Sequence, residues 1–385
     1  MTVIRDILQS LCRQEFFNQL TPVLDTLSIN YSIIKGEALS IQAYGSTGNR
    51  NFTDIDILVA RKNLNIIEQR LMNNGFFNVS QSRSDKITMI TGSHQIAPWI
   101  KEIYPWGQVV VDLNFDIFWG EYEGNRIDID EFVSDAIERN IYGTKVKTLA
   151  ILKAMVQLIL HHYKDMNSIF LLATRKSIKY EMFKDVYYLL KNNLGIISID
   201  SLYDISLKYD IVPYVYYILY YTGQVFNDEM LNRYIDAFRT PTGEGLLNCY
   251  GLCAKEQKEW KYNFQTRIEA DSIYDLIKDD LTEKDKEKID INRRIFLGDY
   301  IIMEVTKEKI LEIINDIVQN ETINSEQYDE DLSKFGMDSI RFIQIIISLE
   351  DVFECEVPDV NLILTQMNTI NKIYDVLISI KSNNK

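Results

Sequence analysis

The chain has 385 residues, of which 46% are hydrophobic and 25% charged, as in an ordinary folded protein of two or three domains. Its net charge of −15 argues against a nucleic-acid-binding surface, which needs a basic footprint, and fits protein or small-molecule partners. Four cysteines without metal-ligand spacing, no signal-peptide pattern and no apolar run of membrane-spanning length predict a cytoplasmic protein, with no membrane partner and no zinc site or disulfide framework.

The first 44 residues predict a helix, a short strand and a second helix. Apolar residues recur at three- and four-residue steps over 1–28, and a β-rich run covers 31–34. Lys35 and Gly36 follow, and 37–44 is predicted to be helical. Gly36 permits close approach of the backbone to a ligand, and a helix start attracts phosphate. Lys35 is a nearby cation for a triphosphate, although a plain strand-to-helix turn is the alternative interpretation of Gly36.

A strand over 52–59 is predicted to carry two carboxylates on one face. Successive strand side chains point to opposite sides, so Asp54 and Asp56 share a face. Neighbouring carboxylates repel each other and are costly to bury unless a cation lies between them. Oxygen ligands suit Mg²⁺. The strand is therefore predicted to be the metal platform of a nucleotidyl transfer site, with Arg50, in the polar loop before it, as a second cation for the triphosphate.

The next chemically distinctive segment is an alternating strand over 109–118, which follows a helix predicted at 64–72. Its polar face carries Asp112. If this strand pairs beside the Asp54/Asp56 strand, Asp112 becomes a third carboxylate that binds metal or serves as a general base. The alternative is an edge strand with a solvated polar face.

These residues resemble a known superfamily. Ile34-Lys-Gly-Glu-Ala-Leu39, Gly48-x-Arg50 and Asp54-Ile-Asp56-Ile-Leu-Val59 are similar to the DNA polymerase beta-like nucleotidyltransferases, and most similar to the small bacterial branch that has a Lys-Gly start. The resemblance implies an α/β (α+β) core with a small mixed sheet flanked by helices. It also implies Mg²⁺-dependent transfer of a nucleoside monophosphate from an NTP, expected to be ATP, with release of pyrophosphate.

The resemblance also implies roles for individual residues. Asp54 and Asp56 would hold the metal, and Asp112 would be the third catalytic carboxylate. Two turns compete for the phosphate-binding position, Lys35-Gly36 and Gly45-Ser46; the first is favoured because it follows a strand and opens a helix. The residues expected to bind the nucleotide are Lys35, Gly36, Ser46 and Arg50.

From about residue 128 to residue 300 the chain is predicted to be mostly helical. A long apolar helix over 151–163 ends in His161-His162, for which capping or packing is expected rather than a ligand role, because adjacent helix residues do not share a face. Asp185, on a later helix, is expected to orient that helix rather than to react. The dense alternating charges of 278–294 predict a solvated helix face or a tether.

The C-terminal segment predicts a separate helical domain. Helices are expected over 309–318 and from Ser339 through Phe353, and Asp338 or Ser339 lies where an N-cap belongs. A capping hydroxyl is therefore one interpretation of Ser339. The segment Leu332-x-x-Phe-Gly-Met-Asp-Ser339-Ile, with Leu349-Glu-Asp-x-Phe353 and Val357-Pro358-Asp, resembles an acyl or peptidyl carrier protein along its whole length.

The carrier resemblance implies a four-helix bundle and a 4′-phosphopantetheine arm on Ser339. The implied partners are a phosphopantetheinyl transferase and other biosynthetic enzymes that dock on the carrier. Arg341 makes this face less acidic than that of many fatty-acid carriers, which favours an aminoacyl or peptidyl cargo.

The sequence therefore predicts a catalytic domain at 1–135, a helical domain with a charged linker at 136–300 and a carrier domain at 303–385. The predicted function is transfer of a nucleoside monophosphate to a small-molecule or carrier-tethered acceptor in thiotemplated natural-product assembly. Two alternatives stay open: formation of an acyl-adenylate that loads the carrier arm, and an inactive transferase core that docks the carrier to other enzymes. The base of the nucleotide, the acceptor and the cargo are not predicted.

Overall fold

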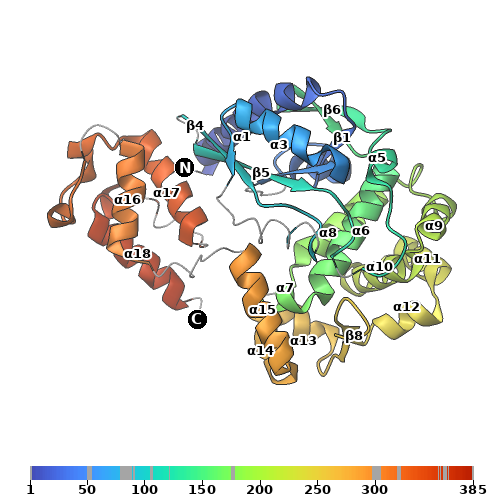
Figure 1. Ribbon diagram of the computed structural model, residues 1–385. Helices are drawn as coiled ribbons and strands as arrows, with labels where there is room; N and C mark the ends of the chain where they lie inside the picture. Colours follow the sequence, from blue (N-terminus) through green and yellow to red (C-terminus); the bar gives the residue numbers. More distant parts are fainter. Residues whose placement is uncertain are drawn as a thin grey trace. The chain divides into compact units, whose positions relative to one another are not determined.

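The computed structural model divides the chain into two compact units (Figure 1). The larger is formed by Phe16–Lys101 and Val109–Leu297, and the smaller includes Gly298–Lys385. The structure describes residues 2–49, 54–78, 89, 92–104, 107–120, 122–174, 178–296, 305–318, 322–353, 355, 357, 358, 362 and 364–383. None of the helices in these ranges combines the length and the apolar composition that a membrane span requires.

A mixed sheet organises the N-terminal part of the chain. In the described residues it has seven strands, in the order β3-β4-β5-β2-β1-β7-β6. The strands are β1 (Tyr31–Ile34), β2 (Asp54–Val59), β3 (Phe77–Asn78), β4 (Trp99–Ile103), β5 (Gly107–Asn114), β6 (Ile137–Ile141) and β7 (Thr144–Thr148). The expected mixed sheet flanked by helices is therefore confirmed.

The centre of the sheet consists of β1, β2 and β5. β1 runs antiparallel to β2, and β2 runs parallel to β5. The apolar side chains of β2 explain this central position, because Ile55, Ile57, Leu58 and Val59 are all buried. A strand covered on both faces needs such a nearly continuous apolar run.

The sheet continues beyond residue 135, where the sequence predicted a domain boundary and a mostly helical chain. β6 and β7 form an antiparallel hairpin, and β7 pairs in parallel with β1. The sequence contained no sign of β6, because it is polar and largely exposed and forms a strand by pairing with β7, without a buried apolar stripe. The last strand of the sheet along the chain, β7, therefore ends at Thr148.

Helices flank the sheet and make up most of the larger unit. Among them α6, α8 and α10 lie side by side and share one apolar core (Figure 1). The helices are α1 (Thr2–Asp25), α2 (Gly36–Tyr44), α3 (Leu64–Asn73), α5 (Ile129–Phe132), α6 (Ile151–Asn167), α7 (Ile169–Thr174), α8 (Tyr180–Lys191), α9 (Ile199–Lys208), α10 (Val212–Phe226), α11 (Glu229–Phe238), α12 (Pro241–Leu246), α13 (Phe264–Glu269), α14 (Ile273–Ile277) and α15 (Glu283–Phe296). A small hairpin, β8 (Cys249–Tyr250) with β9 (Lys258–Glu259), lies between α12 and α13 in the chain.

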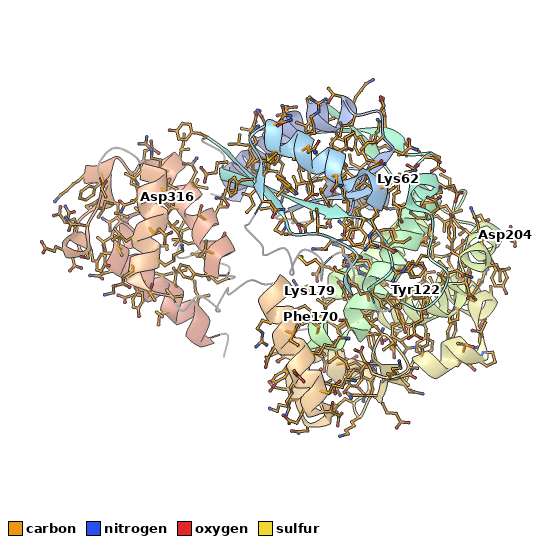
Figure 2. All side chains as sticks on the ribbon, in the orientation of Figure 1. Lys62, Tyr122, Phe170, Lys179, Asp204 and Asp316 are labelled. Atoms are coloured by element: carbon orange, nitrogen blue, oxygen red, sulfur yellow. The ribbon has the colours of Figure 1, made fainter. Side chains whose placement is uncertain are left out.

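Polar contacts attach the helical half to α2, the helix that opens at the predicted phosphate-binding turn. The side chain of Asn192 donates to the carbonyl of Ala43 at 2.7 Å, and that of Asn193 donates to the carbonyl of Gln42 at 3.0 Å. The hydroxyl of Tyr44 donates to the buried carboxylate of Asp185 at 2.7 Å. Asp185 therefore helps to fix α8 against α2, in agreement with the orienting role expected for it. On the outside of the unit, charged side chains such as Lys62 extend toward solvent (Figure 2).

The C-terminal unit is helical, as expected for a carrier domain. Its α-helices are α16 (Lys307–Val318), α17 (Ser339–Phe353) and α18 (Ile370–Asn383), joined by segments that contain the 3₁₀ turns η3 (Ser325–Gln327), η4 (Leu332–Phe335) and η6 (Leu364–Gln366). Buried apolar side chains from every helix form one core; examples are Ile314, Phe335, Leu349 and Ile373.

Candidate functional site

The two central parallel strands bring three carboxylates together. Asp56 on β2 lies directly opposite Asp112 on β5. Oxygen atoms of Asp54, Asp56 and Asp112 all lie within 4.8 Å of one another. The predicted pairing of the two acidic strands is therefore confirmed. We call these three residues the carboxylate triad.

Burial and mutual repulsion make the triad energetically unfavourable without a cation. The pKa of Asp54 is raised by burial and by the charge of Asp56. Burial and the charges of Asp56 and Asp54 raise the pKa of Asp112 to about 8. A buried carboxylate whose pKa is raised to about 8 is in a site with too little positive charge. Such a site favours a divalent cation.

Lys35 and Asn114 hold Asp56 in place. The Lys35 ammonium donates to Asp56 Oδ1 at 2.7 Å, and the Asn114 side-chain amide donates to the same oxygen at 3.0 Å. Burial lowers the pKa of Lys35, but the charge of Asp56, the hydrogen bond to it and the charges of Asp54 and Asp165 together outweigh burial and raise the pKa. Lys35 is thus a fixed cation at the edge of the triad. Asn114 had no predicted role, although it lies two residues after Asp112 and therefore on the same face of the strand.

The backbone of Lys35 is strained where it places this cation. Its φ of 55° and ψ of −152° fall in a region that residues with a side chain rarely adopt. Such a conformation costs about 1–3 kcal/mol and persists where the surrounding structure enforces it, often at functional sites. Here it lies between buried β1 and α2, whose first residue, Gly36, also has a positive φ of 39°. The turn predicted at Lys35-Gly36 is therefore present, directly between strand and helix.

The second predicted turn, Gly45-Ser46, follows α2 instead of preceding it. Ser46 is exposed, and its hydroxyl accepts a hydrogen bond from the Asn49 side chain at 2.8 Å. The buried Glu37 carboxylate accepts from the Gly48 amide at 3.0 Å, which ties this loop to α2. The predicted nucleotide-binding role of Ser46 stays a prediction. Arg50 lies outside the described residues.

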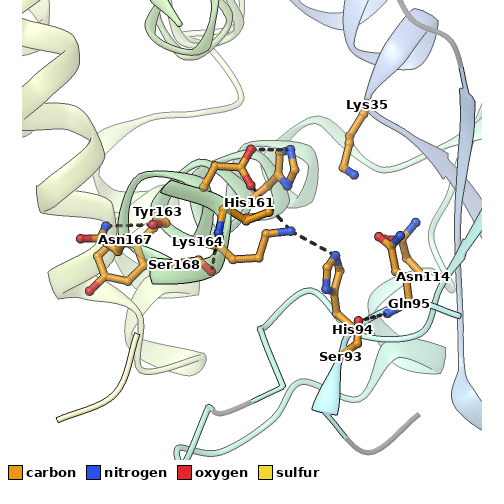
Figure 3. Close-up of polar contacts among 12 residues, drawn as sticks. Lys35, Ser93, His94, Gln95, Asn114, His161, Tyr163, Lys164, Asn167 and Ser168 are labelled. Atoms are coloured by element: carbon orange, nitrogen blue, oxygen red, sulfur yellow. Dashed lines mark hydrogen bonds and ion pairs between the residues drawn. The ribbon is translucent and has the colours of Figure 1, made fainter. Parts of the chain in front are cut away.

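Helix α6 contributes polar groups that sequence reasoning missed. The Lys164 ammonium lies 3.1 Å from His94 Nε2, and His161 lies 3.4 Å from the Asp165 carboxylate (Figure 3). Figure 3 shows Lys35 on the other side of the same space, and the charges interact: Asp165 raises the pKa of Lys35, and Lys35 lowers the pKa of His94. His94 and Lys164 gave no signal in the sequence, since 70 residues separate them and only the fold unites them.

Lys164 and His94 interact as an ammonium and a neutral imidazole. Burial lowers the pKa of His94 well below its usual range, and the charges of Lys164 and Lys35 lower it further. A neutral imidazole nitrogen can accept a hydrogen bond from an ammonium group. Lys164 therefore donates and His94 accepts.

The triad fits Mg²⁺ by the chemistry of its donors. Its three residues supply only oxygen ligands, which this hard cation prefers. The raised pKa values of Asp54 and Asp112 show that the side chains lack compensating charge. The described residues contain a second group, His161, His162 and Asp165, whose nitrogen and oxygen atoms also approach one another within 4.8 Å. Its imidazoles suit Mg²⁺ less well, so the triad is the better candidate.

Replacing Asp112 should stabilise the metal-free protein most strongly at alkaline pH. Because its folded pKa is raised from 3.8 to about 8, folding binds a proton in this window, and the free energy of unfolding falls as pH rises through it. Asp112→Asn has no carboxyl group to titrate there. We expect its free energy of unfolding to exceed that of wild type by roughly 1–3 kcal/mol at pH 8 and by less at pH 5. Urea unfolding in EDTA, followed by tryptophan fluorescence, measures it.

Tryptophan emission reports mainly on the larger unit, because Trp99, Trp119 and Trp260 lie in it and 298–385 contains no tryptophan. Asp130→Asn, at a partly exposed position outside the triad, is the matched control and should follow the wild-type pH dependence. If the free energy of unfolding depends on pH in the same way in Asp112→Asn and in wild type, the pKa of Asp112 is not raised in the folded protein.

The second candidate position is Ser339 at the start of α17. The carboxylate of Asp338 accepts from the amides of Ile340 at 3.0 Å and Arg341 at 2.8 Å, so Asp338 is the N-cap. Ser339 is exposed, and the cap does not depend on its hydroxyl. The Arg341 guanidinium donates to the carbonyl of Gly336 at 2.7 Å, which fastens the preceding turn to the helix. The interpretation of Ser339 as a mere capping residue therefore loses its basis.

Comparisons with known proteins identify a family for each of the two parts of the chain. A family described as "Uncharacterised nucleotidyltransferase" matches residues 7–227, and a family described as "Phosphopantetheine attachment site" matches residues 308–377. Among solved structures, the chain is similar to an antigenic nucleotidyltransferase-like protein from Paracoccidioides brasiliensis, with 17% identity, a TM-score of 0.30, and coverage of 56% of this chain and 96% of that one. Among curated proteins no match was found.

Proposed function

The chain belongs to the uncharacterised nucleotidyltransferase family and carries a C-terminal phosphopantetheine attachment domain, and from this premise we propose that it transfers a nucleoside monophosphate from an Mg²⁺-bound NTP to an acceptor hydroxyl. The observation that carries the proposal is the carboxylate triad on two adjacent parallel strands, with oxygens within 4.8 Å. An oxygen-only site with raised carboxyl pKa values requires a cation, and a nucleoside triphosphate arrives with one.

In the proposed reaction the acceptor oxygen bonds to the α-phosphorus and pyrophosphate leaves with the electron pair of the broken P–O bond. Bound Mg²⁺ would neutralise the charge that builds on the attacking and leaving oxygens. Asp54 and Asp56 would hold the ion, while Lys35 and Asn114 fix the position of Asp56. Asp112, the third carboxylate of the triad, would take the proton of the acceptor hydroxyl.

The attachment domain bears on which acceptor is used. An exposed Ser339 that plays no part in capping can receive a phosphopantetheine arm without cost to the helix. We propose that the nucleotide acceptor, or a later intermediate made from it, is carried on this arm as a thioester in thiotemplated assembly. Fusion to a carrier raises the local concentration of the tethered substrate.

Mass spectrometry tests this proposal against formation of an acyl-adenylate. The protein carrying the arm is incubated with Mg²⁺, each of the four NTPs labelled at the α-phosphate, and candidate hydroxy and amino acids. Nucleotidyl transfer predicts labelled product that keeps the phosphate ester, together with released pyrophosphate. A bare acyl thioester on the arm, with free nucleoside monophosphate, would favour the acyl-adenylate route instead. Nucleotide binding that neither Mg²⁺ nor Asp56 affects would favour an inactive docking core.

A further inference from the structure

The polar groups that face the triad from α6 have no role in the reaction described so far. The charges on the strand side are three carboxylates and one ammonium, that of Lys35. One divalent ion would bring this side close to neutrality. A bound triphosphate adds further negative charge, and the phosphates that leave as pyrophosphate need a cation that Mg²⁺ and Lys35 do not fully supply.

Lys164 is suitably placed to provide that cation. Its side chain is 13% exposed, its ammonium lies 3.7 Å from Asp165, and it donates to His94 at 3.1 Å. Figure 3 shows that Lys164, His94 and Lys35 point toward a common space between α6 and the sheet. The same residues influence each other's charge, because Lys164 and Lys35 both lower the pKa of His94.

We propose that Lys164 is a binding residue for the pyrophosphate part of the NTP, and that His94 is a positioning residue that directs its ammonium toward the triad. This inference rests on the proposed nucleotidyl transfer. His94 suits the positioning role because a neutral imidazole orients the ammonium without neutralising it, and the Asp165 carboxylate lies farther from that ammonium, at 3.7 Å against 3.1 Å for His94. Lys164 would then bridge from the helical half of the unit to the leaving group.

Inorganic pyrophosphate is the probe, because it needs no knowledge of the base or the acceptor. Calorimetric titration measures the affinity of the full-length protein for Mg²⁺ alone and for pyrophosphate in the presence of Mg²⁺. We expect Lys164→Met to weaken pyrophosphate binding about tenfold to a hundredfold, the range for loss of one charge-assisted hydrogen bond. Affinity for Mg²⁺ alone should stay within about twofold, because the triad remains intact.

Lys153→Met is the matched control. Lys153 lies on the same helix with the same 13% side-chain exposure, but its ammonium pairs with Asp135 at 2.8 Å. Its pyrophosphate affinity should equal that of wild type. A purely structural role for Lys164 predicts instead lower stability with unchanged pyrophosphate affinity in the folded fraction, and that result would overturn the inference. Should Lys164→Met not fold, His94→Ala decides: about threefold weaker pyrophosphate binding supports the inference, and unchanged binding overturns it.

Failure of this inference can be told from failure of the proposed function. If wild type binds Mg²⁺ and NTP through Asp56 while Lys164→Met binds pyrophosphate normally, only the role of Lys164 is lost. If wild type binds neither Mg²⁺, nor pyrophosphate, nor any of the four NTPs, the nucleotidyl transfer proposal fails together with it.

Discussion

Asp56→Asn is expected to lower nucleotidyl transfer at least about a thousandfold, equivalent to roughly 4 kcal/mol of transition-state stabilisation. Asp56 is the member of the triad that accepts from both Lys35 and Asn114, so its carboxylate has the most fixed position. The amide of Asn keeps the shape but offers one neutral oxygen where the ion needs a charged one. Pyrophosphate release from each NTP at saturating Mg²⁺ measures the rate, and titration calorimetry measures the accompanying loss of Mg²⁺ affinity.

Asp130→Asn separates the loss of a metal ligand from the loss of an ion pair. The Asp130 carboxylate meets the Lys62 ammonium at 2.7 Å, the same distance as between Asp56 and Lys35, but on the surface and outside the triad. This control should keep wild-type rate and Mg²⁺ affinity. Equal activity in Asp56→Asn and Asp130→Asn would exclude Asp56 from metal binding and leave the triad without a catalytic role.

Asp112→Asn should raise the free energy of unfolding of the metal-free protein although it removes a residue proposed to act in the reaction. The triad carries more negative charge than Lys35 can offset, as the raised pKa values of Asp54 and Asp112 show. Removing the Asp112 carboxylate relieves this repulsion in the absence of metal and leaves the ion pair between Lys35 and Asp56 in place. Carboxylate repulsion and backbone strain in one place, here at the triad and at Lys35, are typical of a functional site, where ligand binding offsets the loss of stability.

The triad could be predicted from the sequence because it depends only on side-chain alternation within two strands and on the pairing of those strands. Alternation alone placed Asp54 and Asp56 on one face, and pairing of two acidic strands then determined that Asp112 would join them. The turn at Lys35-Gly36 was likewise visible as a strand, a glycine and a helix in succession. Each of these inferences used residues close in sequence or a single pairing of strands.

The opposite wall of the site was not predictable in the same way. His94 lies in an irregular segment before β4, and Lys164 lies near the end of α6. Neither position follows a motif, and their contact depends on how the helical half packs on the sheet. The β6–β7 hairpin was missed because β6 has no buried apolar stripe, and the contact that joins the hairpin to the sheet, between β7 and β1, spans more than a hundred residues of chain.

In the carrier unit, the sequence left two candidates for the N-cap of α17, and the hydrogen bonds distinguish them. Asp338 accepts from the amides of Ile340 and Arg341, and Ser339 is therefore the first helical residue, with an exposed side chain. Sequence spacing cannot resolve a one-residue difference at a helix start. The difference matters here because a capping hydroxyl would be engaged with the backbone, whereas this one is accessible to a modifying enzyme.

Ser339→Ala is expected to abolish attachment of the phosphopantetheine arm completely while leaving the unit folded. The variant removes the only oxygen that the predicted modification uses, and the cap on Asp338 stays in place. Alanine is also a good helix former, so the free energy of unfolding should change by less than about 0.5 kcal/mol. Intact-protein mass after incubation with coenzyme A and a phosphopantetheinyl transferase measures attachment: wild type should gain one arm and the variant none.

Two matched variants test whether the effect belongs to the modified hydroxyl or to the helix start. Ser333→Ala removes an exposed hydroxyl six positions earlier, in η4, and should leave attachment complete. Asp338→Ala removes the cap, which should cost about 1 kcal/mol of stability and slow attachment while still permitting it. An arm that persists in Ser339→Ala would show that another residue is modified. No gain of mass in wild type would overturn the carrier assignment for Ser339 itself, whatever the transferase core does.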